Sequence, residues 1–170
     1  MSEYDKNKWS VSMEKEISAP AEKVWAQMTN PASVTIWHPF VKKNTSDNWS
    51  GIGSTDTVVY NNGTAIKREI VDWIEGTGYD LKVSKSAGNE DLIVWRITPI
   101  DGEHCKLNIT AHITSTEKFP FPIRWAVHKR KIRPVLTQYF DLAMQGFAYH
   151  AETDKQVMRN QFGAHSQFSP

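Results

Sequence analysis

The hydrophobic pattern of this chain changes its period once, near residue 119, and this change constrains the fold more than any other feature. Before it, apolar and polar residues alternate most clearly over His104–Ser115. After Phe119-Pro-Phe-Pro122, apolar residues recur at helical spacing, at Leu136, Phe140, Ala143, Phe147 and Ala151, with Tyr139 and Met144 beside them. The chain is therefore predicted to form strands first and then one long helix, from near Pro134 to about Val157.

Six further segments show strand patterns bounded by turn residues. The first predicted strand is Trp9–Ile17, in which Val11, Met13 and Ile17 alternate with polar residues. The later strands are predicted at Phe40–Thr45, Thr55–Tyr60, Thr64–Ile74, Tyr79–Lys85, Leu92–Thr98 and His104–Ser115. Short turns such as Asn61-Asn62-Gly63 and Asp101-Gly102 join neighbours, which indicates an antiparallel meander.

Two short helices are predicted between the first and second strands. Ser18 or Ala19 would cap the first, with Pro20 in its first turn, and the second would span Pro31 to Trp37. Segment 123–132 is expected to form either a shorter helix or an extension of the long helix, kinked at Pro134.

Length, charge and cysteine content narrow the class of protein. A length of 170 residues suits one domain, predicted at 9–160, with a polar extension at 1–8 and a tail at 161–170. The single cysteine excludes an intramolecular disulfide and multi-cysteine metal sites. A net charge of +1 gives no reason to expect nucleic-acid binding. With no signal peptide, lipidation motif or apolar run that could span a bilayer, we expect a cytoplasmic protein.

The order of these elements resembles the helix-grip fold of the START-like superfamily (SRPBCC), which includes polyketide cyclases/dehydrases and lipid-transfer domains. Ile17-Ser-Ala-Pro-Ala-Glu-Lys-Val-Trp25 is similar to the superfamily's I-x-A-P-x-x-x-V-W segment. Trp37-His38-Pro39, Gly51-Ile-Gly53 and Gly146-Phe-x-x-His150-x-Glu152-Thr153 also match in order. The resemblance implies an α+β fold in which a curved antiparallel sheet of about seven strands wraps around the C-terminal helix. It also implies a ligand cavity between helix and sheet.

Aromatic residues are the first candidates for the wall of such a cavity, and a plain aromatic core is the alternative. They are Trp37, Tyr60, Trp73, Tyr79, Trp95, Phe140 and Phe147, with Ala143 and Met144 on the same helical face. Strand parity places Tyr79 and Trp95 on the helix side. Parity in Thr64–Ile74 is ambiguous, and a bulge there would switch its two faces.

Three polar residues are weighed as ligand contacts. Arg68 lies on a two-sided strand, so a surface position is favoured; pointing inward, it would need Asp72 or a ligand carboxylate as partner. His38 would either contact a ligand as donor or acid/base, or end a helix with local hydrogen bonds. His150 shares the helical face of Phe147. His104 and His112 lie in the last predicted strand and are expected to face solvent. No metal site is predicted.

The leading hypothesis is a pocket protein that binds or carries a small hydrophobic or amphipathic molecule, such as a lipid, isoprenoid or polyketide. A cyclase/dehydrase-like enzyme is the alternative, although the sequence offers no nucleophilic triad and no catalytic residue is assigned. A third hypothesis is a protein- or membrane-interaction module that uses the basic segment 124–133. No cofactor is expected, and the chain is expected to be a monomer or weak homodimer.

Overall fold

The computed structural model describes residues 9–46, 48–86 and 89–169. The predicted extension at 1–8, and two residues of the turn that Ala87-Gly88-Asn89 predicts, lie outside the described residues. The elements in chain order are β1 (Ser10–Ile17), α1 (Ala21–Thr29), α2 (Val34–Trp37), β2 (Val41–Ser46), β3 (Thr55–Tyr60), β4 (Ala65–Ile74), β5 (Gly78–Ser86), β6 (Asn89–Pro99), β7 (Cys105–His112), α3 (Phe121–Val127), the π-helix η1 (His128–Ile132) and α4 (Arg133–Thr153).

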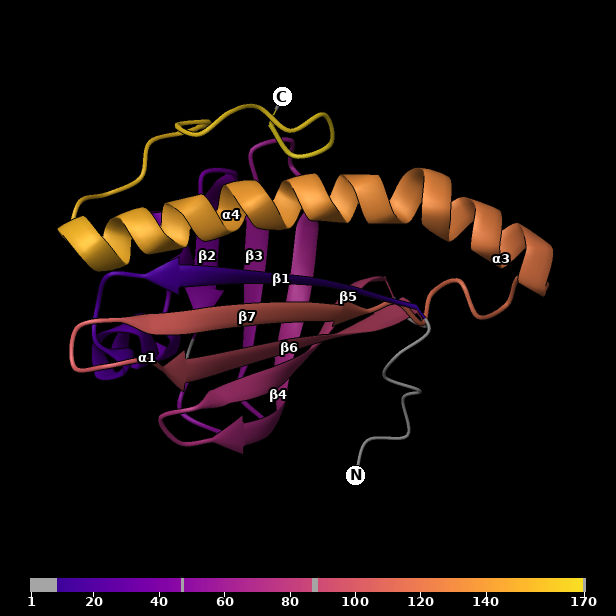
Figure 1. Ribbon diagram of the computed structural model, residues 1–170. Coiled ribbons are helices and arrows are strands. Elements are labelled where there is room, and N and C mark those ends of the chain that lie inside the picture. Colours follow the sequence, from indigo (N-terminus) through magenta and orange to yellow (C-terminus); the bar gives the residue numbers. More distant parts are fainter. Residues whose placement is uncertain (1–8, 47, 87–88, 170) are drawn as a thin grey trace.

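All seven strands form one antiparallel sheet in the order β1-β7-β6-β5-β4-β3-β2. Strands β2 to β7 follow the chain as a meander, whereas β1 closes the opposite edge by pairing with β7. The sheet bends so that β2 and β3 run nearly crosswise to β7 (Figure 1). The predicted α+β helix-grip fold with two short helices after the first strand is confirmed.

Strand β4 contains a β-bulge, which resolves the ambiguity about which of its side chains face the core. Its register against β5 shifts between Ile70 and Asp72. Ile66 and Ile70 are buried before the shift, and Trp73 lies opposite Tyr79 after it. One extra residue in a strand reverses which side chains face the core, so both stretches supply side chains to the same face.

Of the two alternatives for segment 123–132, the structure shows the extension of the long helix. Elements α3, η1 and α4 form a continuous 33-residue helix that begins at Phe121, and its end comes earlier than the sequence predicted. Proline cannot donate to the carbonyl four residues earlier, and its ring crowds that carbonyl. The π-turn before Pro134, in which the Arg133 N–H bonds the His128 carbonyl, provides a wider turn at this point. The helix ends at Thr153 and not Val157, because Asp154 adopts a left-handed conformation with φ 57°.

Helix α1 begins one or two residues later than expected. Pro20 is its N-cap and not a first-turn residue, and its carbonyl accepts the N–H groups of Lys23 and Val24. Neither Ser18 nor Ala19 caps the helix. The correction shifts the boundary of the helix, whose side chains Val24 and Met28 are buried in the core.

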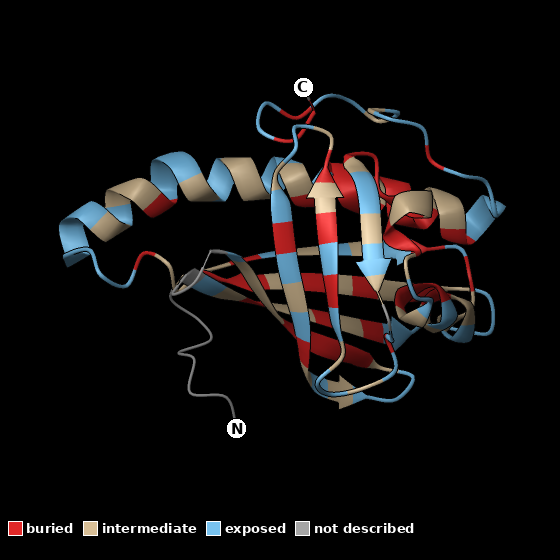
Figure 2. Cartoon of the chain, turned by 180° about the vertical axis from the view of Figure 1, so that it is seen from behind, coloured by how far each residue is buried: buried red, intermediate tan, exposed pale blue. Residues whose placement is uncertain are grey.

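The core lies between α4 and the concave face of the sheet (Figure 2). Phe140, Met144 and Phe147 are buried there, which confirms the predicted apolar face of the helix. Gly146 allows α4 to approach α2 closely, because a Cβ at this position would lie 2.3 Å from the Trp37 carbonyl oxygen. One strand histidine departs from its predicted position: His112 is buried, whereas His104 lies at the surface beside Asp101.

Residues 161–169 have no helix or strand, as expected of a tail, but they pack against the rest of the chain. The segment runs back over α4 (Figure 1), and Phe168 is buried beside Tyr60 and Tyr139, with ring centroids 4.6 and 5.0 Å apart. The Nε2 atom of His165 lies 3.1 Å from the carbonyl oxygen of Val135. The segment therefore covers one side of the long helix.

Candidate functional site

A cavity of about 550 Å³ lies between the long helix and the sheet. That volume is within the usual range for small-molecule sites. Its wall is mostly apolar, and the long helix contributes Ile132, Val135, Leu136, Tyr139, Phe140, Ala143 and Met144. The opposite wall comes from α2, the strands and the C-terminal segment, including Trp37, Tyr60, Ile66, Leu81, Trp95, Ile109 and Phe168.

A chain of three polar side chains lies in this wall. The Nε2 atom of His38 is 2.9 Å from the Tyr139 hydroxyl, which is 2.6 Å from the Tyr60 hydroxyl. The backbone N–H of Phe40 donates to Nδ1 of the same histidine at 3.2 Å. His38 thus ends α2, as one interpretation of the sequence held, and also contacts the cavity.

Burial determines the protonation states of these three side chains. It lowers the pKa of His38 from 6.5 to about 3, with a smaller contribution from the positive charge of Arg68. It also raises the pKa of both tyrosines, Tyr60 and Tyr139. At neutral pH all three groups are therefore uncharged. A histidine with so low a pKa is a weak general base, and the chain is better suited to hydrogen bonding than to proton transfer.

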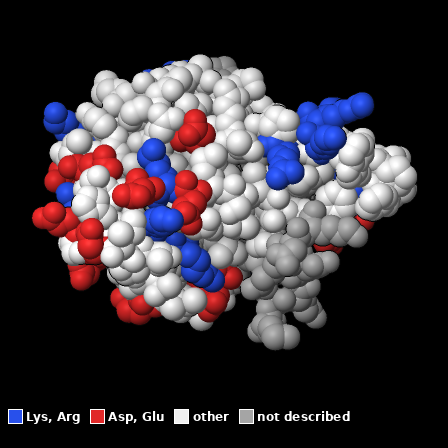
Figure 3. Space-filling view, in the orientation of Figure 1, with Lys and Arg blue, Asp and Glu red and all other residues white. Residues whose placement is uncertain are grey.

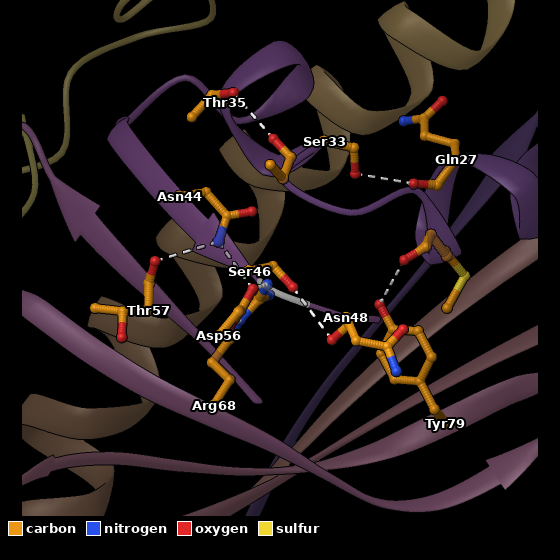
Figure 4. A network of polar contacts seen from close by, with 12 residues as sticks. Gln27, Ser33, Thr35, Asn44, Ser46, Asn48, Asp56, Thr57, Arg68 and Tyr79 are labelled. Carbon is orange, nitrogen blue, oxygen red and sulfur yellow. Dashed lines mark hydrogen bonds and ion pairs between the residues drawn. The ribbon is translucent and has the colours of Figure 1, made fainter. Parts of the chain in front are cut away.

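Arg68 points inward, which corrects the favoured surface position, and its partner is neither Asp72 nor a ligand. Its Nε donates to Oδ1 of Asp56 at 2.8 Å, and one Nη donates to Oδ2. The two residues lie directly opposite each other in the β3–β4 register. The Asn44 side chain also donates to Asp56 (Figure 4), so the buried carboxylate is held by two neighbours and neutralises the arginine.

Eight of the twelve predicted site residues line the cavity: Trp37, His38, Tyr60, Arg68, Trp95, Phe140, Ala143 and Met144. Whether they bind a ligand remains a prediction. The other four, Trp73, Tyr79, Phe147 and His150, do not line this cavity.

Helix α1 covers the end of the sheet where Trp73 lies. The Trp73 indole packs against Trp25 of α1 at 4.9 Å, and both indoles donate to Glu75. Tyr79 is buried beside them, and its hydroxyl donates to the Met28 carbonyl at 3.3 Å. Both residues are therefore outside the main cavity.

Phe147 and His150 lie too far along α4. Phe147 packs behind the cavity wall against Trp37, with ring centroids 5.0 Å apart, and like Tyr79 it borders a second void of about 10 Å³. His150 is near the end of the helix, where its Nδ1 is 2.9 Å from the Lys155 carbonyl oxygen. It helps to end the helix and does not line the cavity.

Sequence reasoning missed Tyr139, Asp56 and Phe168 as site residues. Tyr139 could have been predicted as a site residue, because it lies on the predicted apolar face of the long helix beside Phe140. Asp56 is identified only by the register of β3 against β4. Phe168 lies in an aperiodic segment that carried no pattern at all.

The basic segment 124–133 forms the end of the long helix that projects beyond the sheet (Figure 1). We call residues 121–133 the overhang. Its apolar side chains Phe121, Ile123 and Trp125 are exposed by 61, 52 and 47%. Its five Lys and Arg residues have no acidic residue among them, and blue side chains gather at this end in Figure 3. Lys131 and Ile132 of the overhang also line the cavity.

The described residues offer little other chemistry. Cys105 is buried, and burial raises the pKa of its thiol. Among residues 9–46, 48–86 and 89–169, no cluster of three or more His, Cys, Asp or Glu side chains could hold a metal ion. Within those same ranges, no helix combines the length and apolar character needed to cross a membrane.

Comparison with known families gives one match. The family model described as polyketide cyclase / dehydrase and lipid transport matches residues 8–152. No curated protein matches the chain.

Several solved structures share the fold. DynU16, a protein of the dynemicin biosynthetic locus, superposes with a TM-score of 0.67 and 17% identity over 90% of this chain, which spans only 52% of DynU16. A START superfamily protein from Mycobacterium smegmatis has a TM-score of 0.61 and 13% identity, with 83% of this chain and 97% of that chain covered. A solution structure of a Thermobifida fusca protein has a TM-score of 0.64 and 18% identity, with 85 and 93% covered. At such identities the likeness shows the fold alone.

Proposed function

The chain belongs to the polyketide cyclase/dehydrase and lipid transport family, and we propose that it binds or carries a small hydrophobic or amphipathic ligand in the cavity between the sheet and the long helix. Residues 9–160 are proposed to be the ligand-binding domain, with the C-terminal segment adding Phe168 to the wall. Lipids, isoprenoids and polyketides are the ligand classes that such a wall would suit.

The volume of the cavity is the observation that carries this proposal. A protein of this size normally fills its interior to the density of an organic crystal, leaving few voids larger than a water molecule. Here about 550 Å³ stays open beside side chains such as Phe140, Ala143 and Trp95, which are otherwise buried. An open apolar space of that size is costly unless a ligand uses it.

The protonation states of the polar residues in the cavity wall favour a carrier over an enzyme. Catalysis of cyclisation or dehydration would require groups that exchange protons near neutral pH. His38 has a pKa of about 3, and burial moves the pKa of Tyr60 and Tyr139 above the usual value. The cyclase/dehydrase alternative keeps one supporting observation, because these hydroxyls border the cavity and would stabilise negative charge that develops on a bound carbonyl oxygen.

The overhang supports contact with an anionic membrane surface during ligand exchange. Its exposed aromatic and aliphatic side chains would enter the interface, and its five cations would attract acidic headgroups. Because Lys131 and Ile132 belong both to the overhang and to the cavity wall, a docked overhang would bring the cavity close to the bilayer.

Native mass spectrometry of freshly purified protein tests the main proposal. We expect a bound apolar molecule to be retained, and a fluorescent apolar probe to compete with it. Protein that carries no ligand and never takes up such a probe would contradict the proposal.

A further inference from the structure

Hydrogen bonds fix where the protons of the polar chain lie. Nδ1 of His38 accepts the Phe40 backbone N–H, so this nitrogen carries no proton. A neutral imidazole has a single N–H, which must then be on Nε2, and burial keeps the ring neutral by lowering its pKa to about 3. Nε2 therefore donates to the Tyr139 oxygen at 2.9 Å.

Tyr60 and Tyr139 together carry two hydroxyl protons, but the hydrogen bond between them uses only one. Their oxygens are 2.6 Å apart, and the hydrogen bond that joins them consumes one hydroxyl proton. Since the Tyr139 oxygen already accepts from His38, the second hydroxyl proton has no acceptor among the described side chains. This holds whichever tyrosine donates to the other. Both residues line the cavity, so the pair offers a donor to it.

The one carboxylate among the lining residues, Asp91, accepts the backbone N–H groups of Thr114 and Ser115 and not a tyrosine hydroxyl. Asp56 neutralises Arg68 and accepts from Asn44, and it does not line the main cavity. The Trp37 indole N–H is buried and has no acceptor among the described residues. A buried donor without an acceptor costs free energy, which a suitable ligand would recover.

We propose that the ligand carries an uncharged carbonyl oxygen, as in a ketone or a quinone, and that this oxygen accepts the free hydroxyl proton of the Tyr60–Tyr139 pair. The inference rests on the proposed function and specifies the ligand that the same cavity takes. Because Asp56 already neutralises Arg68, this arginine gives the tyrosine pair no positive charge with which to select a carboxylate over a ketone.

Two probes of matched shape test this inference: the methyl ketone of naphthalene, and its isopropenyl analogue, in which a CH₂ group replaces the carbonyl oxygen. Affinities for both are measured by fluorescence on wild type, on the double variant Tyr60→Phe, Tyr139→Phe, and on Tyr149→Phe. Tyr149 is the control, because it lies on α4 but packs outward against Phe162 and does not line the cavity. Either single substitution in the pair would leave the other tyrosine with a free hydroxyl proton, so both hydroxyls are removed together. We expect the preference for the ketone to fall about fivefold in the double variant and to be unchanged in Tyr149→Phe.

Infrared spectroscopy of the bound ketone gives a second readout that needs no variant. The carbonyl stretch should lie below its frequency in an apolar solvent when the probe is bound to wild type. An unshifted stretch would overturn the inference, as would an unchanged preference in a folded Tyr60→Phe, Tyr139→Phe double variant, while the carrier function would stand. If neither probe bound to wild type, the proposed function itself would fail.

Discussion

The two ends of the long helix have opposite surroundings. From Phe140 to Ala151, eight residues are buried, and residues 140–153 contain no Lys or Arg. In the overhang only His128 is buried, and five of the thirteen residues are Lys or Arg. One continuous helix is thus held by packing at one end and exposed to solvent at the other, with the cavity where the two meet. Substitutions of similar kind should therefore have very different effects at the two ends.

Truncation of a large apolar side chain to alanine should show the largest difference. Phe147 is 1% exposed, so Phe147→Ala is expected to lower the free energy of unfolding by about 3–5 kcal/mol. Ile123→Ala in the overhang should change it by less than about 0.5 kcal/mol. Urea unfolding of both variants checks the comparison. Equal losses would mean that the overhang is buried in solution.

Acid should weaken the buried end through His38. Its pKa is 6.5 when unfolded and about 3 when folded, so below pH 6.5 the unfolded state binds a proton that the folded state does not. Stability is therefore full above pH 6.5 and falls as the pH decreases, by about 3 kcal/mol between pH 7 and 4.5.

Chemical denaturation across this pH range, compared between wild type and His38→Gln, isolates the effect. The variant should lose about 3 kcal/mol less than wild type over the interval. His104→Gln is a comparison of opposite sign: Asp101 raises the pKa of the His104 imidazole, so this variant should lose stability gained on acidification and not the acid sensitivity due to His38. A His38→Gln curve parallel to that of wild type would show that the histidine is not held neutral by burial.

Enlarging an alanine should separate cavity from packed core within the buried end. Ala143 lines the cavity, so Ala143→Trp should cost less than about 1 kcal/mol while abolishing uptake of an apolar probe. Ala148 is buried on the same helix but does not line the cavity, so Ala148→Trp should cost at least about 1–3 kcal/mol. Melting curves and probe titrations decide this, and an Ala143→Trp variant as unstable as Ala148→Trp would remove support for the carrier.

Charge reversal in the overhang should have the smallest effect on stability and a clear effect on membrane binding. The double variant Lys129→Glu, Arg130→Glu should leave the melting temperature nearly unchanged. Its binding to vesicles of phosphatidylcholine with phosphatidylglycerol should weaken, since each lost cation contributes about 1 kcal/mol near such a surface.

The matched control reverses Lys42 and Lys43, two exposed residues of β2 away from the overhang. Co-sedimentation with these vesicles, and with phosphatidylcholine alone, compares the two variants. An equal loss in both would mean that net charge alone governs vesicle binding. Failure of wild type to bind would exclude the membrane role.

The fold could be predicted because each element has its own period, and the change near residue 119 separates sheet from helix. The site could be predicted only where a pattern placed side chains on one face, as for Trp95, Phe140 and Ala143. The partner of Arg68 could not be, because it depends on register. Val59 pairs with Ala65, which sets Asp56 opposite Arg68, and a turn one residue longer would pair Arg68 with another residue.

The position of β1 has a consequence for how the chain folds. Every other strand pairs with neighbours in sequence, but Ile17 pairs with Cys105, 88 residues later. Closing so long a loop costs more entropy than forming a hairpin, so the meander should form before β1 joins it. Pulse-labelled hydrogen exchange during refolding should protect the amides of β4 and β5 earlier than those of β1. During synthesis, β1 leaves the ribosome before its partner β7 and waits longer to pair than the other strands of the sheet.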